Sequence, residues 1–116
     1  MNELGRQTLI NAALRGQEQH FGSFSDGGDK LCGLGVLLHE AGARMPLNDD
    51  SIDSGDWVRA QEMYEWKSVP DNICRLCDFP GDRGYSDTTF IAHLNDVHRL
   101  DFIGIAQKMG VKEETL

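Results

Sequence analysis

Two cysteines and two histidines in the second half of the chain have the residue types and the spacing of a zinc site. They follow the pattern Cys-x2-Cys-x15-His-x4-His, formed by Cys74, Cys77, His93 and His98. A Cys-x2-Cys turn supplies two thiolates from a short stretch of backbone, and a following helix supplies two imidazoles, which completes the tetrahedral set that Zn²⁺ prefers. The intervals are close to those of C2H2 zinc fingers. The sequence therefore predicts a C2H2-like zinc-binding knuckle and helix with a structural zinc ion.

The spacing of the two histidines sets a condition on the helix that carries them. On a regular helix with 3.6 residues per turn, positions 93 and 98 point about 140° apart. Both imidazoles can face one ion only if the last turn tightens or opens, or if His98 lies past the helix end. Residues 99–101 look like a break between two helices, with Asp101 as the next N-cap, so we expect a relaxed final turn.

The residue pattern leaves other ligand sets open. One of the four ligands can be replaced by Cys32, His20 or His39. Without a metal, the Cys-x2-Cys pair would be a redox pair, but its neighbours lack the βαβ pattern of a thioredoxin-like site. A catalytic zinc would need an open position beside a general base, for which one of the same histidines or Glu40 is a candidate without distinctive spacing. Asp78 and Asp96 lie close to predicted ligands and are expected to accept hydrogen bonds from imidazole N–H groups.

The charge of the chain argues against direct nucleic-acid binding. There are 19 acidic and 11 basic side chains, and the net charge is −8. Such a charge repels a polyanion at long range. The predicted finger helix begins with Asp-Thr-Thr at residues 87–89, without the arginine or lysine that reads guanine or binds phosphate.

The sequence also lacks the signals of a secreted or membrane protein. The opening residues have neither the basic start nor the apolar run of a signal peptide, and the longest apolar stretch, residues 31–38, is too short to span a bilayer. The 3 cysteines cannot all pair within one chain. These features favour the reducing environment of the cytoplasm.

Apolar periodicity predicts a mainly α fold with a short β-hairpin. Helices are expected over residues 2–15, 31–41 and 56–67, the last capped by Ser54 or Asp56, and an extended segment or hairpin over 20–31. Two further helices carry the apolar stripes Phe90, Leu94 and Val97, and Phe102, Ile105, Ala106 and Met109, the second ending at Gly110. Gly33 and Gly35 lack the other residues of a phosphate loop and are expected to allow close helix packing.

All segments are expected to form one small domain. Residues 1–71 make a helical core region with an acidic loop at 43–56, residues 72–100 the zinc-finger-like segment, and residues 101–116 a C-terminal helix and tail. A homodimer is a general expectation for a domain of this size.

An acidic and aromatic stretch is the candidate partner-binding surface. It contains Asp49, Asp50, Asp53, Asp56, Trp57 and Trp66. Dense carboxylates can imitate phosphates to a protein that binds nucleic acid, and an exposed aromatic can anchor a partner. The alternative is a solvated loop followed by tryptophans that belong to the core.

Two stretches resemble a family of small uncharacterised phage and prophage proteins. "NAALRGQEQHFGSF" with "CGLGVLLHEAGA" is similar to the family's opening and its "CCLGVLCDLAG" helix, and "HLNDVHRLDFIGIAQKM" to its "LND" close. The resemblance implies a compact, mainly helical fold and a phage origin, and it implies no activity. The chain departs from the pattern at Gly33, where a second cysteine is expected, and at Leu38-His39 in place of Cys-Asp. Cys32 is then a remnant within the core helix.

These observations lead to a functional hypothesis. The chain is expected to be a non-enzymatic, zinc-stabilised, acidic phage protein in the bacterial cytoplasm that binds a host protein. The favoured partner is a nucleic-acid-binding defence protein, which would make the chain an inhibitor of a CRISPR or other defence nuclease. The alternative is a zinc-finger nucleic-acid-binding phage regulator.

Overall fold

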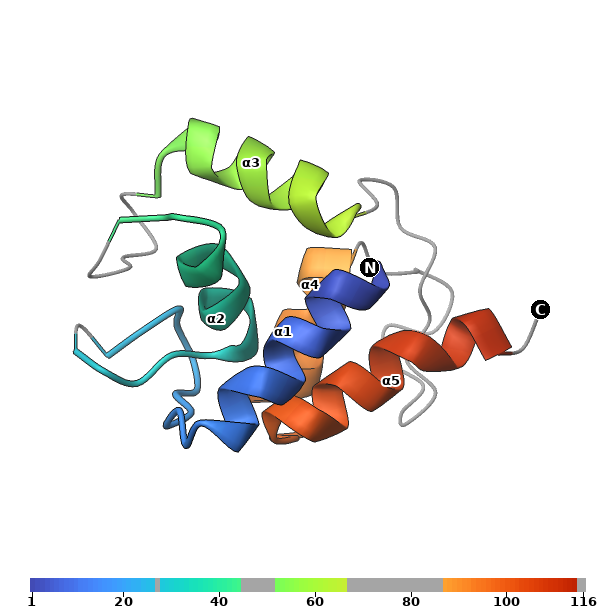
Figure 1. Cartoon of the computed structure of the whole chain (residues 1–116). Helices are drawn as coiled ribbons and strands as arrows, with labels where there is room; N and C mark the ends of the chain where they lie inside the picture. Colours follow the sequence, from blue (N-terminus) through green and yellow to red (C-terminus); the bar gives the residue numbers. More distant parts are fainter. Residues whose placement is uncertain (27, 45–51, 67–86, 115–116) are drawn as a thin grey trace.

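The described part of the chain is built from five α-helices. The computed structural model describes residues 1–26, 28–44, 52–66 and 87–114. The helices are α1 (Glu3–Leu14), α2 (Gly33–Glu40), α3 (Ser54–Tyr64), α4 (Asp87–Asp96) and α5 (Phe102–Glu114). Figure 1 shows α1 lying along α5, with α3 across the top of α2 and α1. The prediction of a mainly helical fold is confirmed.

Helix α1 forms where the sequence predicts it. Asn2 is the N-cap, and its side-chain oxygen accepts a hydrogen bond from the Gly5 N–H at 3.0 Å. Leu9 and Ala12 are fully buried on the inner face. The backbone N–H of Asn2 also donates to the Tyr64 carbonyl at 2.9 Å, which ties the start of α1 to the end of α3.

Helix α2 is enclosed by the rest of the fold, and its start differs from the prediction. Cys32 precedes the helix as its N-cap, and its Sγ accepts a hydrogen bond from the Gly35 N–H at 3.2 Å. The expectation that Cys32 lies within the helix is therefore wrong. Close packing at Gly33 is confirmed, because a Cβ there would lie 3.0 Å from Ile105 Cδ1 and 3.4 Å from Ile91 Cγ2.

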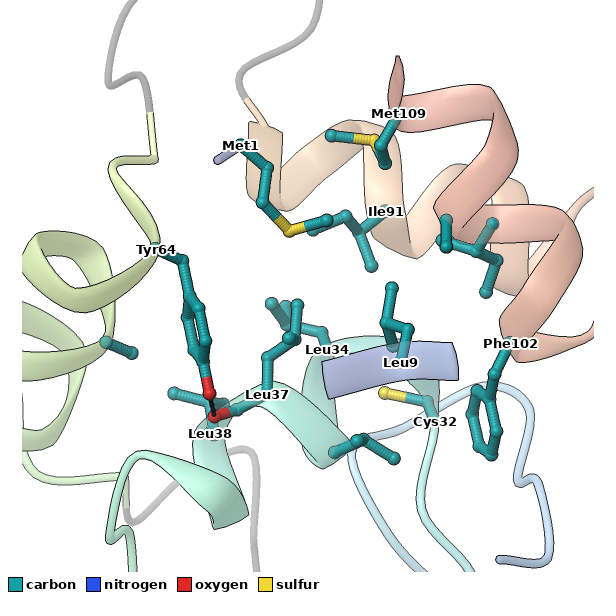
Figure 2. Packing of buried hydrophobic residues seen from close by; sticks show 14 of the residues in the cluster. Met1, Leu9, Cys32, Leu34, Leu37, Leu38, Tyr64, Ile91, Phe102 and Met109 are labelled. Atoms are coloured by element: carbon teal, nitrogen blue, oxygen red, sulfur yellow. Dashed lines mark hydrogen bonds between the residues drawn. The ribbon is translucent and has the colours of Figure 1, made fainter. Parts of the chain in front are cut away.

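One hydrophobic core joins the described helices. Side chains from α1, α2, α3, α4 and α5 meet in it, as Figure 2 shows for Leu9, Leu37, Tyr64, Ile91 and Met109. The Tyr64 hydroxyl donates to the Leu37 carbonyl at 3.0 Å, which satisfies both polar groups inside the core. Helices from all three predicted segments thus contribute to the same core.

Helix α3 begins slightly earlier than predicted. Its N-cap is Asp53, whose side chain accepts from the Gly55 N–H at 2.9 Å, so the expected caps Ser54 and Asp56 are both wrong. The helix ends at Tyr64, and Glu65 follows in the left-handed region with φ 53°. This conformation ends the helix, as it commonly does at this position.

The core-facing stripes of α4 and α5 are partly as predicted. Phe90 and Leu94 are buried, but Val97 lies beyond the end of α4 and is 62% exposed, while Ile91 takes the predicted place in the core. All four predicted residues of α5 are buried: Phe102, Ile105, Ala106 and Met109. Helix α5 continues through Gly110 to Glu114, so the predicted end at Gly110 is wrong.

The segment from residue 20 to residue 31 is not a regular hairpin. In the described residues, its pairing consists of isolated bridges of Leu31 with Gln19 and with Ser25. The Asp26 side chain accepts from the backbone N–H groups of Gly28 at 2.8 Å and Lys30 at 3.3 Å, which forms a turn. The Gly28 hydrogen bond holds the pKa of Asp26 below its ordinary value.

In the described residues, none of the helices combines the length and the apolar character needed to cross a bilayer.

Candidate metal centre

Two of the four predicted zinc ligands meet at the end of α4. The Nε2 atoms of His93 and His98 lie 3.1 Å apart. Their ring centroids are 4.8 Å apart and the ring planes are inclined by 78°. Both side chains are half-buried. The predicted pair of imidazoles is therefore brought together in space.

The backbone achieves this by opening the last turn of the helix. The N–H of Val97 still donates to the His93 carbonyl at 2.9 Å, but the N–H of His98 donates to the same carbonyl at 3.4 Å, five residues back. Arg99 then adopts a left-handed conformation with φ 53°, which turns the chain towards α5. His98 lies past the helix end. The relaxed final turn that the spacing required is confirmed.

The distance between the imidazole nitrogens fits a shared ion. With Zn–N bonds of about 2.0–2.1 Å, two nitrogens 3.1 Å apart subtend an angle of roughly 100°, near the tetrahedral value. The ring centroids are only 1.7 Å further apart than the two Nε2 atoms (4.8 Å against 3.1 Å). The rings therefore meet at an angle and do not point straight at each other, as expected for two ligands of one ion. An N–H···N bond between neutral rings has the same length, so the geometry accommodates either arrangement.

Electrostatics favour the neutral, metal-binding form of one ring. Burial lowers the pKa of His93, and the neighbouring His98 ring lowers it further. A neutral imidazole carries the nitrogen lone pair that a metal ion binds. The His93 ring is therefore suited to coordination at neutral pH.

The remaining predicted ligands, Cys74 and Cys77, lie outside the described residues. Among residues 1–26, 28–44, 52–66 and 87–114, no group of three or more His, Cys, Asp or Glu side chains is placed to hold a metal. None of the three alternative ligands therefore joins His93 and His98 in such a group.

Cys32, His20 and His39, the alternative ligands, have other contacts or positions in the fold. Cys32 caps α2, as described above. The Nε2 of His20 lies 2.9 Å from the Ser23 hydroxyl, and His39 is exposed on α2.

Asp96 has a different role from the predicted one. Its Oδ1 accepts from the Gly22 N–H at 2.9 Å and from Asn95 Nδ2 at 2.7 Å. Asp96 thus orients the segment around Gly22 rather than an imidazole ring. Asp78, the other expected acceptor, lies outside the described residues.

Asn95, which the sequence interpretation did not identify, organises the polar contacts beside the histidines. It is fully buried. Its Oδ1 accepts from the Gly33 N–H at 2.9 Å and from Gln19 Nε2 at 2.8 Å, and its Nδ2 donates to the His20 carbonyl at 3.0 Å and to Asp96. These contacts use the full hydrogen-bonding capacity of the amide. A polar residue four positions after Ile91, on the core-facing side of the helix, was the available signal.

A buried ion pair lies at the other end of α4. The amino group of Met1 lies 2.7 Å from Asp87 Oδ2, and both groups are 0% exposed. The sequence interpretation placed Asp87 only at the start of the predicted finger helix. The pair ties the start of α1 to the helix that carries the histidines.

The candidate partner-binding residues are divided between surface and core. Asp49 and Asp50 lie outside the described residues. Asp53 is exposed as the cap of α3, whereas Asp56 is 12% exposed and bonds Arg59 at 2.8 Å. The carboxylates therefore do not form one free acidic surface in the described part of the chain.

The two tryptophans belong to an aromatic row rather than to an exposed anchor. Trp57 lies edge-on to Phe24 with centroids 5.8 Å apart, and Trp66 lies 6.1 Å from Trp57 and 5.7 Å from Tyr64. Trp66 is 6% exposed, and its Nε1–H finds no acceptor among the described residues. This burial favours the core interpretation of Trp66.

The outer side of α3 exposes a different set of residues. Val58 is 53% exposed. Glu62, one turn further along the helix, is exposed on the same side. Glu65 is also exposed, but it lies past the helix end in a left-handed conformation, where its carboxylate accepts a hydrogen bond from Asn2 Nδ2 at 3.0 Å. Val58 and Glu62 thus give α3 an exposed apolar residue beside an exposed carboxylate, and Arg59, Gln61 and Met63 are exposed as well.

Comparisons with known proteins give no relatives. The chain matches no protein-family model, no curated protein and no solved structure. The resemblance to small phage proteins stays a prediction from the quoted segments.

Proposed function

We propose that the chain is a zinc-stabilised domain that binds another protein and has no enzymatic activity of its own. The observation that supports the metal is the approach of His93 and His98 to 3.1 Å between their Nε2 atoms. Cys74 and Cys77 supply the other two ligands in this proposal. Four protein ligands fill the tetrahedral shell of Zn²⁺ and leave no open position for a substrate or a reactive water.

The ion would act as a structural crosslink. It would join the end of α4 to the segment that carries the two cysteines. A structural zinc ion contributes on the order of 10 kcal/mol to the local folding of the segment that it crosslinks.

The partner class follows from charge. A net charge of −8 disfavours nucleic acid and favours a basic protein surface. On the exposed side of α3, the apolar Val58 lies one turn before the carboxylate of Glu62, and the carboxylate of Glu65 follows just past the helix end. We define this set as the α3 acidic face and assign it the partner contact.

The finer form of the proposal is a phage-derived inhibitor of a host defence nuclease. A CRISPR effector or a similar nuclease has a basic surface for nucleic acid, and carboxylates can occupy such a surface in place of phosphates. Loss of substrate cleavage when the purified chain is added to the nuclease tests this form. Unchanged cleavage by a panel of such enzymes, despite tight protein binding, would direct the search to another basic host protein.

The metal is tested by native mass spectrometry of protein purified without added zinc. One zinc ion per chain is expected in the wild type. The His93→Ala and Cys74→Ser variants are expected to lose it. His39→Ala, which removes an exposed histidine from α2, is the matched control and is expected to retain it. Metal-free wild-type protein that also fails to bind added zinc would refute the metal centre.

The partner contact is tested by reversing charge on α3. The wild type and a Glu62→Lys variant are used to capture bacterial proteins, and each captured protein is then purified and titrated by calorimetry. At least about tenfold weaker binding is expected for the α3 variant, since rim and interface charges contribute at this level. The control is Asp29→Lys, which makes the same charge change at an exposed position outside α3.

The purified wild-type chain also tests the alternative function, a nucleic-acid-binding regulator. A mobility shift of duplex DNA or RNA that weakens steeply with salt would favour a regulator over a protein-binding domain. No shift at low salt is the result expected here.

A further inference from the structure

The loop of residues 19–25 is fastened to the same turn that brings the two histidines together. Four contacts make this connection. They are Gly22 N–H to Asp96 Oδ1 at 2.9 Å, Asn95 Nδ2 to the His20 carbonyl at 3.0 Å, Gln19 Nε2 to the Leu100 carbonyl at 2.6 Å, and the Arg99 guanidinium 4.0 Å from the centre of the Phe21 ring. The loop therefore depends on the position of residues 95–100.

The residues that hold the 19–25 loop lie between and directly after the two histidines in the sequence. Asn95 and Asp96 lie between His93 and His98, and Arg99 follows directly. The backbone there is irregular, with the widened turn at His98 and the left-handed Arg99. Such a turn depends on side-chain contacts because it lacks the regular hydrogen-bond ladder of a helix.

We propose that metal binding by His93 and His98 controls the order of the 19–25 loop. This inference rests on the proposed metal centre and concerns what the metal does to the rest of the fold. An ion held by both Nε2 atoms fixes His98 relative to His93 and so fixes the turn between them. The acceptor on Asp96 and the stacking surface on Arg99 are then held in place for Gly22 and Phe21.

The effect is a coupling between two sites. If the metal stabilises the ordered loop, the ordered loop must strengthen metal binding by the same factor. The loop side of the coupling includes Phe21, which is half-buried under Arg99. The surface that this loop presents is then present in the metal-bound protein and lost in the metal-free protein.

The first test measures amide hydrogen exchange in the full chain by NMR, with zinc bound and after chelation. Exchange at the Gly22 N–H is expected to speed up at least about fivefold on chelation, the lower end of typical coupling. The reference is the Val36 N–H, which bonds Cys32 within the buried start of α2. Bound zinc with unchanged exchange at Gly22 would overturn the inference, as would an equal acceleration at both amides, which reports general unfolding.

The second test uses reciprocity. Asp96→Ala removes the acceptor for the Gly22 N–H and is expected to weaken zinc binding about fivefold or more. The effect would be indirect, because the hydrogen bonds of Asp96 go to Gly22 and Asn95 and not to a histidine. Asp96→Asn removes the negative charge but keeps an acceptor oxygen, so its zinc affinity is expected to stay near that of the wild type. Equal losses in both variants would assign the effect to charge and contradict the coupling.

The two proposals fail in different ways. Absence of zinc in the mass spectrum removes the metal centre and the coupling with it. Zinc bound with full affinity in Asp96→Ala leaves the metal centre intact and removes only the coupling.

Discussion

The side-chain oxygen of Asn95 accepts a hydrogen bond from the backbone N–H of Gly33 at 2.9 Å, although 62 positions separate the two residues. Gly33 opens the "GLGVLL" helix and Asn95 is the central residue of "LND", two of the segments on which the predicted resemblance to phage proteins depends. Helix α2 begins there, and its first N–H groups have no partner within the helix. Asn95 therefore serves as a cap supplied by another helix.

Replacing Asn95 with alanine is expected to lower the free energy of unfolding by about 3 kcal/mol or more. The change leaves the buried Gly33 N–H and the partly buried His20 carbonyl without their partner, and a buried polar group that loses its partner costs about 1–3 kcal/mol. Urea unfolding followed by circular dichroism measures the loss. Asn11→Ala is the matched control, because Asn11 bonds Gln7 on the exposed side of α1, and it is expected to change stability by less than about 0.5 kcal/mol.

Substitution of Gly33 by alanine is expected to destabilise the core by about 1–3 kcal/mol. The added Cβ would lie 3.0 Å from Ile105 Cδ1, a contact too close for an unstrained side chain. Ile105→Val removes that methyl group, so the Gly33→Ala/Ile105→Val double variant is expected to lose less than the sum of the two single changes. Thermal unfolding of all four proteins gives the coupling energy, and strict additivity would contradict the assigned contact.

The sequence predicted the parts of the fold that depend on local periodicity. The four apolar positions of α5 are buried because the spacing of Phe102, Ile105 and their neighbours persists along a regular helix. The same periodicity predicted that Val97 would be buried, but it is exposed. Helix α4 ends at Asp96, so the helical phase no longer applies one residue later.

The candidate metal centre was also predictable only where local spacing along the chain determines the geometry. The types and spacing of His93 and His98 identified the pair, and the angle between positions on a helix predicted that the last turn must open. Asn95 and Asp87 were not predictable in their roles. Their partners come from residues far away in the sequence, and a polar side chain carries no local signal of a distant partner.

The ion pair between the Met1 amino group and Asp87 is expected to contribute strongly to stability. Both groups are 0% exposed, so Asp87→Asn would leave a buried positive charge without its counter-charge. Loss of one partner of a buried pair costs about 3–5 kcal/mol. Denaturant unfolding at neutral pH measures this change.

The control for Asp87 is a surface pair of similar length. Glu3→Gln removes the carboxylate that bonds Arg6 at 2.7 Å, where the Glu3 side chain is 73% exposed. A change below about 1 kcal/mol is expected there. Equal effects of the two substitutions would contradict the importance assigned to burial.

Alkaline pH is expected to destabilise the fold through Tyr64. Burial raises the pKa of Tyr64 above its ordinary value of about 10, and the charge of Glu40 raises it further, against a hydrogen bond with Thr8 that lowers it. The folded protein then retains the phenol proton at a pH where the unfolded chain has begun to lose it. Because the folded state binds more protons in that window, stability falls as pH rises above about 10.

Tyr64→Phe separates this contribution from those of other groups. The variant is expected to be less stable at neutral pH by about 1–3 kcal/mol, because the buried Leu37 carbonyl loses the Tyr64 hydroxyl as a donor. Above about pH 10 the difference between the two proteins is expected to shrink, since phenylalanine does not titrate. Unfolding curves from pH 7 to pH 11 measure the difference. A gap that stays constant or widens with pH would contradict the assigned direction of the Tyr64 pKa.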